Sequence, residues 1–233
     1  MTKNKLERFA QMDTFSNVVQ LPFNEVFGKD YELKGKWKSD FFGNGNNLVL
    51  ELGCGKGEYT VGLARRYPEK NFIGIDIKGA RMWKGARTAL NEGLKNAAFV
   101  RTRIEFVQSV FDRNEVDEIW ITFPDPQPKK RKKRLSSSRF LNSYKQFLKP
   151  GGIIHLKTDN RPLFEYTQAI ALENNLPVLI ASDNLYENIT EDPVLSIRTF
   201  YEQQFLDQGM NIHYLKFVLT HLNEITEPVE YTE

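Results

Sequence analysis

The chain has 233 residues, of which 40% are hydrophobic and 27% are charged, and its formal net charge is +2. These values are typical of a globular protein with one large domain or two small ones, and they exclude a generally polycationic chain. The single cysteine, Cys54, excludes an internal disulfide and a CxxC metal site, which favours a reducing, cytoplasmic location. The first residues lack the apolar stretch of a signal peptide, and no apolar run approaches the roughly 18 residues of a membrane span.

Residues 1–46 are polar and aromatic, without a clear helical or strand period. We predict a partly ordered N-terminal arm in which Phe15, Leu21, Phe23 and Phe27 pack on the domain that follows. Because the arm also carries several lysines and an arginine, the alternative is a basic arm that contacts nucleic acid. A Gly- and Asn-rich turn then leads into a single domain, residues 47–233.

From residue 48 the chain alternates between short apolar runs and longer segments with apolar residues at helical spacing. We predict strands at residues 48–52, 71–77, 97–101, 116–123, 153–157, 177–182 and 213–220. We predict helices at residues 57–67, 79–93, 164–172 and 196–206, and one from residue 136 that Pro150 ends. Strands separated by helices indicate right-handed crossovers, so the predicted fold is α/β, with a doubly wound, mostly parallel sheet and helices on both faces.

A glycine-rich turn joins the first of these strands to the first of these helices. Residues 50–57 read Leu-Glu-Leu-Gly-Cys-Gly-Lys-Gly, and Gly53 and Gly55 allow the backbone to approach a ligand closely. The spacing differs from the Gly-x-Gly-x-x-Gly of dinucleotide-binding dehydrogenases, which disfavours that class. Glu51 in the turn and Asp76 at the end of the next strand suit a cofactor with a cationic group and ribose hydroxyls. The alternative is that both acids only cap loops.

Residues 120–134 are the most unusual stretch of the chain. A buried strand is followed by three prolines that hold Asp125 in a stiff, extended exit from the sheet. Six consecutive cations, residues 129–134, come next. A fixed carboxylate beside dense positive charge predicts a reacting centre with a loop that grips a polyanion. The alternatives are a solvated charge run and a nuclear-import signal.

These motifs resemble those of known enzymes. The glycine turn with the acid of the second strand looks like the class I S-adenosylmethionine-dependent methyltransferases. Residues 123–131, Phe-Pro-Asp-Pro-Gln-Pro-Lys-Lys-Arg, are similar to the signature of the bacterial tRNA (guanine-N7)-methyltransferase family. So are Lys-Thr-Asp-Asn at 157–160, Phe-Glu-Tyr at 164–166 and Thr-Phe-Tyr-Glu at 199–202. The resemblance runs from about residue 45 to the end, and it implies a Rossmann-like sheet of about seven strands whose last strand is antiparallel.

The resemblance also implies roles for individual residues, with S-adenosylmethionine as cofactor, tRNA as partner, no metal, and a monomer or homodimer. The residues implied in cofactor binding are Glu51, Gly53, Gly55, Asp76, Arg103 and Asp125. Asp125 is also the implied catalytic residue, and the implied substrate-binding residues are Lys129, Asp159, Thr199, Phe200, Tyr201 and Glu202. Two positions depart from the family pattern. Gln127 stands where many members have Trp, and Arg103 stands where Asp or Asn often contacts the adenosine, so Glu105 or a backbone amide is an alternative contact there.

The chemistry of the expected acceptor fits these residues. Guanine N7 has a free lone pair and no proton at neutral pH, so its methylation needs positioning in place of a strong general base. We expect Asp125 to stabilise the positive charge that moves onto the purine, and Asp159 to accept hydrogen bonds from guanine N1–H and N2–H. The expected target is the variable-loop guanine of tRNA. The alternatives are a methyltransferase that acts on another RNA base and a non-catalytic RNA-binding relative.

Overall fold

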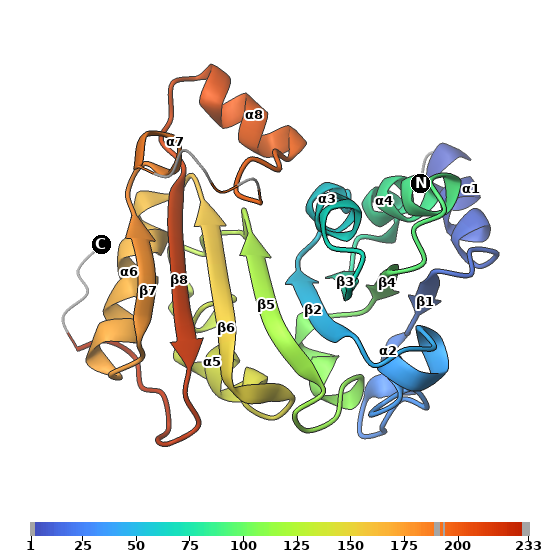
Figure 1. Ribbon diagram of the computed structural model, residues 1–233, viewed down its shortest axis with the longest axis horizontal. Coiled ribbons are helices and arrows are strands. Elements are labelled where there is room, and N and C mark those ends of the chain that lie inside the picture. The colour runs from blue at the N-terminus through green and yellow to red at the C-terminus, as the bar shows by residue number, and fades with distance from the viewer. Residues whose placement is uncertain (1–2, 189–191, 193, 230–233) are drawn as a thin grey trace.

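A computed structural model describes residues 3–188, 192 and 194–229 of the chain. Its centre is an eight-stranded sheet with the strand order β1-β4-β3-β2-β5-β6-β8-β7 (Figure 1). The strands are β1 (Val18–Gln20), β2 (Asn47–Leu52), β3 (Lys70–Asp76), β4 (Ala97–Arg101), β5 (Val116–Thr122), β6 (Leu148–Thr158), β7 (Val178–Ser182) and β8 (His213–Leu219). The α-helices are α1 (Lys3–Met12), α2 (Phe23–Val26), α3 (Glu58–Arg66), α4 (Gly79–Asn91), α5 (Ser138–Tyr144), α6 (Arg161–Glu173), α7 (Leu185–Asn188) and α8 (Phe200–Asp207).

The predicted sheet topology is confirmed. All pairings among strands β1 to β6 are parallel. Strand β8, which lies between β6 and β7, is antiparallel to both of them. The central strands are apolar on both sides, as in Leu48, Val49 and Leu50 of β2, which are at most 1% exposed. Such strands need cover on both faces of the sheet, and this explains the doubly wound arrangement.

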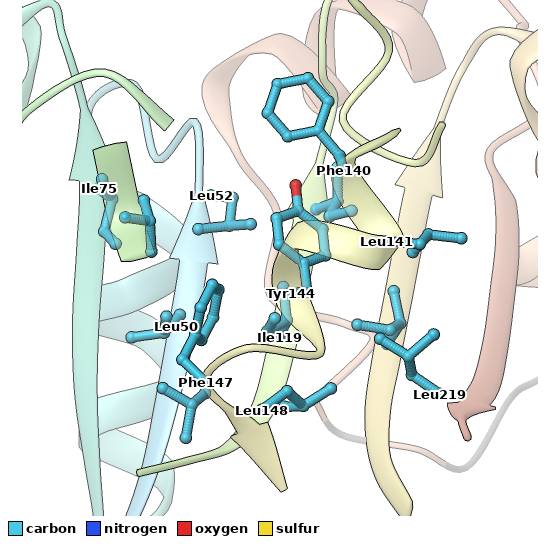
Figure 2. Close-up of a cluster of buried hydrophobic side chains, with 14 of the residues drawn as sticks. Leu50, Leu52, Ile75, Ile119, Phe140, Leu141, Tyr144, Phe147, Leu148 and Leu219 are labelled. Carbon is cyan, nitrogen blue, oxygen red and sulfur yellow. The ribbon is translucent and has the colours of Figure 1, made fainter. Parts of the chain in front are cut away.

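Helices cover both faces, as predicted. Helices α1, α3 and α4 pack on one face, where Met12, Tyr59 and Met82 belong to a single buried cluster. Helices α5 and α6 pack on the other face, where Tyr144 and Leu141 belong to a second buried cluster with Leu50 and Ile119 of the central strands (Figure 2). Within the described part of the chain, no helix is long and apolar enough to cross a membrane.

The N-terminal segment is more closely integrated than the sequence suggests. Strand β1 pairs in parallel with β4 and extends the sheet by one strand. Trp37, in the π-helical turn η1 (Trp37–Phe41), is fully buried, and its indole Nε1 donates to Val110 O at 2.9 Å. Leu21 is also buried, whereas Phe23 and Phe27 are 55% and 60% exposed. The sequence therefore predicts the burial of Leu21 correctly. Phe23 and Phe27 stay largely in solvent, although their ring centres lie 5.5 and 6.3 Å from that of Phe106 in the following domain.

Two helix starts differ from the prediction by three or more residues, and a capping residue explains each. Helix α6 begins at Arg161 because Asn160 is its N-cap, with Asn160 Oδ1 accepting from Leu163 N at 2.9 Å. Helix α8 begins at Phe200, four residues later than expected, because Thr199 is its N-cap. Both caps lie in motifs that the sequence assigns to the site, so the boundaries of the helices are set by the site residues themselves.

Candidate functional site

The site lies at the carboxyl ends of β2, β3 and β5, the edge at which ligands bind in parallel α/β sheets. A pocket of about 250 Å³ opens there between the glycine turn, the loop after β5 and the start of α8. It brings together seven of the predicted site residues, namely Glu51, Gly53, Gly55, Asp76, Asp125, Thr199 and Tyr201. Among the described residues, no group of three or more His, Cys, Asp or Glu side chains is placed to hold a metal ion.

The glycine turn depends on backbone conformations that other residues rarely adopt. Gly53, Gly55 and Gly57 have φ values of +79°, +55° and +69°. A Cβ atom on Gly57 would also lie 2.5 Å from the ring of Phe99, so helix α3 could not start in this position with a larger residue. At Gly53 the added Cβ would meet only Leu135 Cδ1, at 3.7 Å. The turn is therefore tight on its protein side and open toward the pocket.

Glu51 forms the floor of the pocket and is only 3% exposed. Its carboxylate accepts hydrogen bonds from Thr60 N at 2.8 Å, from the Thr60 hydroxyl, and from Thr122 Oγ1 at 2.6 Å. Burial raises the pKa of Glu51 to about 7, although these three hydrogen bonds favour the ionised form. The side chain thus links β2, α3 and β5, and it titrates near neutral pH.

Asp76 joins the end of β3 to the glycine turn. Its Oδ2 accepts from Gly55 N at 2.9 Å, and its Oδ1 accepts from Lys78 N at 2.7 Å. The alternative interpretation, that both acids cap loops, therefore holds for Asp76 but not for Glu51, whose partners lie in α3 and at the end of β5. Both carboxyl groups also line the pocket, so the hydrogen bonds that fix them also fix the acidic side of the pocket.

The loop after β5 presents Asp125 by a bent path that differs from the predicted extended exit. Phe123 and Gln127 have φ values of +47° and +45°, which is a costly conformation for residues other than glycine. Phe123 N donates to Lys157 O at 2.8 Å, which fixes the start of the bend. Gln127 N donates to Asp125 Oδ1 at 3.1 Å. The exposed Asp125 carboxylate is held at the rim of the pocket, where strained backbone is common in functional sites.

The six cations of this loop do not form one surface. Lys129, Lys130, Lys132 and Lys133 are exposed. Arg134 is 1% exposed; its Nε donates to Pro126 O at 2.9 Å, and its guanidinium lies 4.3 Å from the ring centre of Tyr166. The prediction that residues 129–134 all hold phosphates is therefore wrong for Arg134, because a buried side chain cannot reach a polyanion outside the protein. Lys129 remains in the candidate set.

Asp159 follows β6, the strand next to β5, and is half-buried. It does not cap α6, because Asn160 does. Burial raises the pKa of the Asp159 carboxyl group above its ordinary value. Neither Asp159 nor Lys129 lines the pocket itself. Arg103 is exposed at the start of the 3₁₀ helix η2 (Ile104–Ser109), and the structure does not bring it to the pocket.

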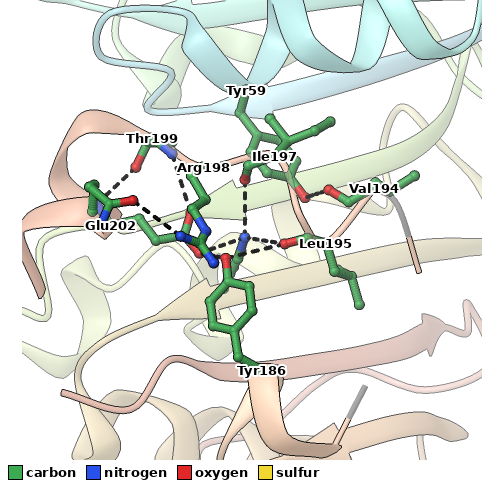
Figure 3. A network of polar contacts seen from close by, with 10 residues as sticks. Tyr59, Tyr186, Val194, Leu195, Ile197, Arg198, Thr199 and Glu202 are labelled. Atoms are coloured by element: carbon green, nitrogen blue, oxygen red, sulfur yellow. Dashed lines mark hydrogen bonds and ion pairs between the residues drawn. The ribbon is translucent and has the colours of Figure 1, made fainter. Parts of the chain in front are cut away.

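The side chains of the Thr-Phe-Tyr-Glu motif lie in three places: the pocket, the interior and the surface. Thr199 and Tyr201 line the pocket, whereas Glu202 is fully buried and closes a capping box with Thr199 (Figure 3). Phe200 is 48% exposed, and its ring centre lies 3.4 Å from Lys56 Nζ. Phe200 N donates to Glu58 Oε2 at 2.8 Å, which fastens the start of α8 to the first turn of α3.

The sequence does not identify the side chains that hold α8 in place. Lys157 lies 2.7 Å from Glu202 Oε1, and both side chains are 0% exposed. The lysine in the predicted strand 153–157 is the signal that could have indicated a buried ion pair, because lysine is almost never fully buried without a partner. Its partner, 45 residues further along the chain, follows only from the fold.

Comparison with known proteins agrees with this geometry. A family model described as "Putative methyltransferase" matches residues 45–215. A tRNA (guanine-N(7)-)-methyltransferase of Bacteroides thetaiotaomicron is 52% identical over 228 residues, which cover 98% of this chain and 90% of the relative. Another relative of the same name, from Christiangramia forsetii, is 52% identical over 93% of this chain and 98% of its own length.

Solved structures show the same fold at low sequence identity. The 16S rRNA methyltransferase KamB superposes with a TM-score of 0.59 at 16% identity, covering 75% of this chain and 88% of its own. The similarity to this structure supports the fold. The 52% identity to the two relatives from Bacteroides thetaiotaomicron and Christiangramia forsetii supports membership of their family. The chain belongs to the tRNA (guanine-N7)-methyltransferase family of S-adenosylmethionine-dependent enzymes.

Proposed function

We propose that this protein transfers a methyl group from S-adenosylmethionine to N7 of a guanine in tRNA, in the cytoplasm. The observation that carries the proposal is a single pocket with the glycine turn, Glu51 and Asp76 on one side and Asp125 on the other. The variable-loop guanine is the target that the family resemblance suggests. The family relationship supports the acceptor, and the pocket supports the cofactor.

The residues of the pocket fit S-adenosylmethionine. The cofactor presents an ammonium group, a sulfonium group and ribose hydroxyls, and when bound it supplies an electrophilic methyl group. Glu51 offers a negative charge to the cationic groups, and Asp76 stands at the end of β3, where ribose hydroxyls are read in related folds. Gly53 and Gly55 leave the backbone open to a ligand on the pocket side.

The proposed role of Asp125 follows from the chemistry of N7. The acceptor atom carries a lone pair and no proton, so the protein has no proton to remove before the transfer. Positive charge appears on the purine as the bond to N7 forms, and a carboxylate at the rim of the pocket stabilises that charge. For Asp159, which follows the neighbouring strand β6, the proposed role is to accept hydrogen bonds from the N1–H and N2–H groups that distinguish guanine.

The exposed lysines of the loop after β5 supply the proposed contact with RNA. The four lysines, at 129, 130, 132 and 133, are exposed and follow Asp125 in the same loop. Contacts with phosphate position a nucleic acid without reading its sequence. Selection of one guanine therefore requires the shape of the folded RNA and the fit of the base in the pocket.

Mapping the product tests the proposed reaction directly. The protein is incubated with labelled S-adenosylmethionine and unmodified tRNA transcripts, and the labelled nucleoside is identified. We expect 7-methylguanosine, at a variable-loop position. Label in another nucleoside would show that the protein is a methyltransferase that acts on a different base. Absence of label from a protein that still binds the cofactor would indicate a non-catalytic RNA-binding protein.

The Asp125→Ala variant tests the catalytic role. We expect kcat to fall at least about 100-fold, the loss that follows removal of one electrostatic stabiliser of a transition state. The affinity for S-adenosylmethionine, measured by calorimetry, should persist, because the glycine turn and Glu51 remain. The matched control is Asp40→Ala, which removes an exposed carboxylate from η1. Normal turnover of Asp125→Ala would sink the proposed role.

Replacing the four exposed lysines at 129, 130, 132 and 133 by Gln tests the RNA contact, with Arg134 kept for stability. Affinity for tRNA should fall, and the slope of log K against log salt should become shallower by about 2–4, or roughly 0.7–0.9 for each phosphate that the loop no longer neutralises. The control is the double variant Lys95→Gln/Arg113→Gln, whose exposed cations precede β4 and β5 at the opposite edge of the sheet. An unchanged slope in the quadruple variant would place the RNA contact elsewhere.

The raised pKa of Glu51 predicts how cofactor affinity depends on pH. With a pKa of about 7, the carboxyl group is mostly neutral at pH 5.5 and half ionised at pH 7. A cationic ligand binds the ionised form better, so affinity should rise on the order of ten-fold between pH 5.5 and 7. The range stays below the pKa of an α-amino group, about 8, so the ligand keeps its charge. Calorimetry on Glu51→Gln should give weaker binding without this rise; an equal rise in both proteins would contradict the assignment.

A further inference from the structure

Lys157 is buried outside the pocket, yet it contacts the segment that closes one side of it. Its Nζ lies 2.7 Å from Glu202 Oε1 and donates to Leu195 O at 2.8 Å and to Ile197 O at 3.2 Å. Figure 3 shows the two carbonyl groups and the Glu202 carboxylate converging on one point. Three acceptors thus surround one ammonium group, which fits the three donors that a lysine offers.

Other side chains fasten the same segment, which we call the strap segment and define as residues 194–202. Tyr59 OH donates to Val194 O at 3.1 Å, and Tyr186 OH donates to Glu202 Oε1 at 2.6 Å. The rings of these two tyrosines lie 5.4 and 5.7 Å from Lys157 Nζ, so they enclose the ammonium group. The strap segment is therefore held from β6, α3 and α7 at once.

The position of the strap segment decides the shape of the pocket. Thr199 and Tyr201 line the pocket, and Thr199 takes its place through the capping box with Glu202, whose carboxylate is the one that Lys157 binds. A buried ion pair is a poor source of stability, because two apolar side chains of similar size usually pack as well. The pair instead fixes the position of the strap segment, because one lysine binds two of its carbonyl groups and a carboxylate at the same time.

We propose that Lys157 is a positioning residue that sets the wall of the cofactor pocket through Glu202 and the strap carbonyl groups. The inference rests on the proposed function, because it takes S-adenosylmethionine as the ligand whose affinity depends on that wall. Lys157 does not line the pocket, so any effect of its replacement on binding has to pass through the strap segment.

The test separates positioning from stability with two variants. Lys157→Met leaves the buried Glu202 carboxylate without a cationic partner, so this variant should have a lower thermal midpoint and a lower affinity for S-adenosylmethionine. The double variant Lys157→Met/Glu202→Met removes both charges and should regain most of the lost thermal midpoint. Because the two strap carbonyl groups still lack the lysine and the capping box has lost Glu202, the Kd of the double variant for S-adenosylmethionine should remain at least ten-fold above that of the unmodified protein. A double variant with unchanged Kd would overturn the proposal.

Two further measurements complete the test. Leu219→Ala, at a fully buried position at the end of β8, should lower the thermal midpoint with Kd unchanged, which shows that lost stability alone does not weaken binding. Tyr186→Phe removes one hydroxyl and should stay folded while its Kd rises several-fold; an unchanged Kd there would count against the proposal even if the Lys157 variants do not fold. If the unmodified protein fails to bind S-adenosylmethionine, the proposed function falls too, whereas equal binding by all variants rejects the positioning role alone.

Discussion

The buried carboxylate of Glu51 is the interaction on which the rest of the site depends. It accepts from the backbone and hydroxyl of Thr60 in α3 and from the hydroxyl of Thr122 at the end of β5. The first contact fixes the start of the helix behind the glycine turn, and the second fixes the strand that leads to Asp125. One side chain therefore sets the distance between the proposed cofactor side and the proposed acceptor side of the pocket. Burial raises the pKa of Glu51 to about 7, so the link carries its full charge only above neutral pH.

The sequence predicts the fold well where periodicity is strong and poorly where it is weak. The central strands contain short apolar runs separated by helical segments, and this pattern indicates a parallel sheet with covered faces. Strand β1 has only the three residues Val-Val-Gln, too few to show a period, so its pairing with β4 depends on tertiary contacts alone. For the same reason the sequence predicts only an arm for the N-terminal segment. Its burial of Trp37 shows that a segment without a period can still belong to the core.

The site, like the fold, is predictable from the sequence only in part. Residues at the carboxyl ends of parallel strands meet at one edge of the sheet, so the predicted parallel sheet already assigns Glu51, Asp76 and Asp125 to the same edge. Whether a charged side chain is buried or exposed was not predictable, because burial depends on the residues that pack against it in the folded chain. Arg134 shows this most clearly. It ends a run of cations, but its planar guanidinium stacks on Tyr166 inside the protein, while the lysines before it stay in solvent.

The placement of the charges also agrees with the chemistry that we propose. A reaction that removes a proton needs a base with a tuned pKa next to the acceptor, but N7 of guanine offers its lone pair directly. What such a reaction needs is an acceptor held in line with the transferred methyl group. The most deeply buried polar contacts of the site, those of Glu51 and of Lys157 with Glu202, both fix the position of other groups. Asp125, the side chain that we expect next to the base, is exposed and placed by a strained backbone bend. The protein thus uses its most deeply buried polar interactions to hold the pocket in shape. This is expected if the alignment of the acceptor limits the rate of transfer more than the basicity of a catalytic side chain does.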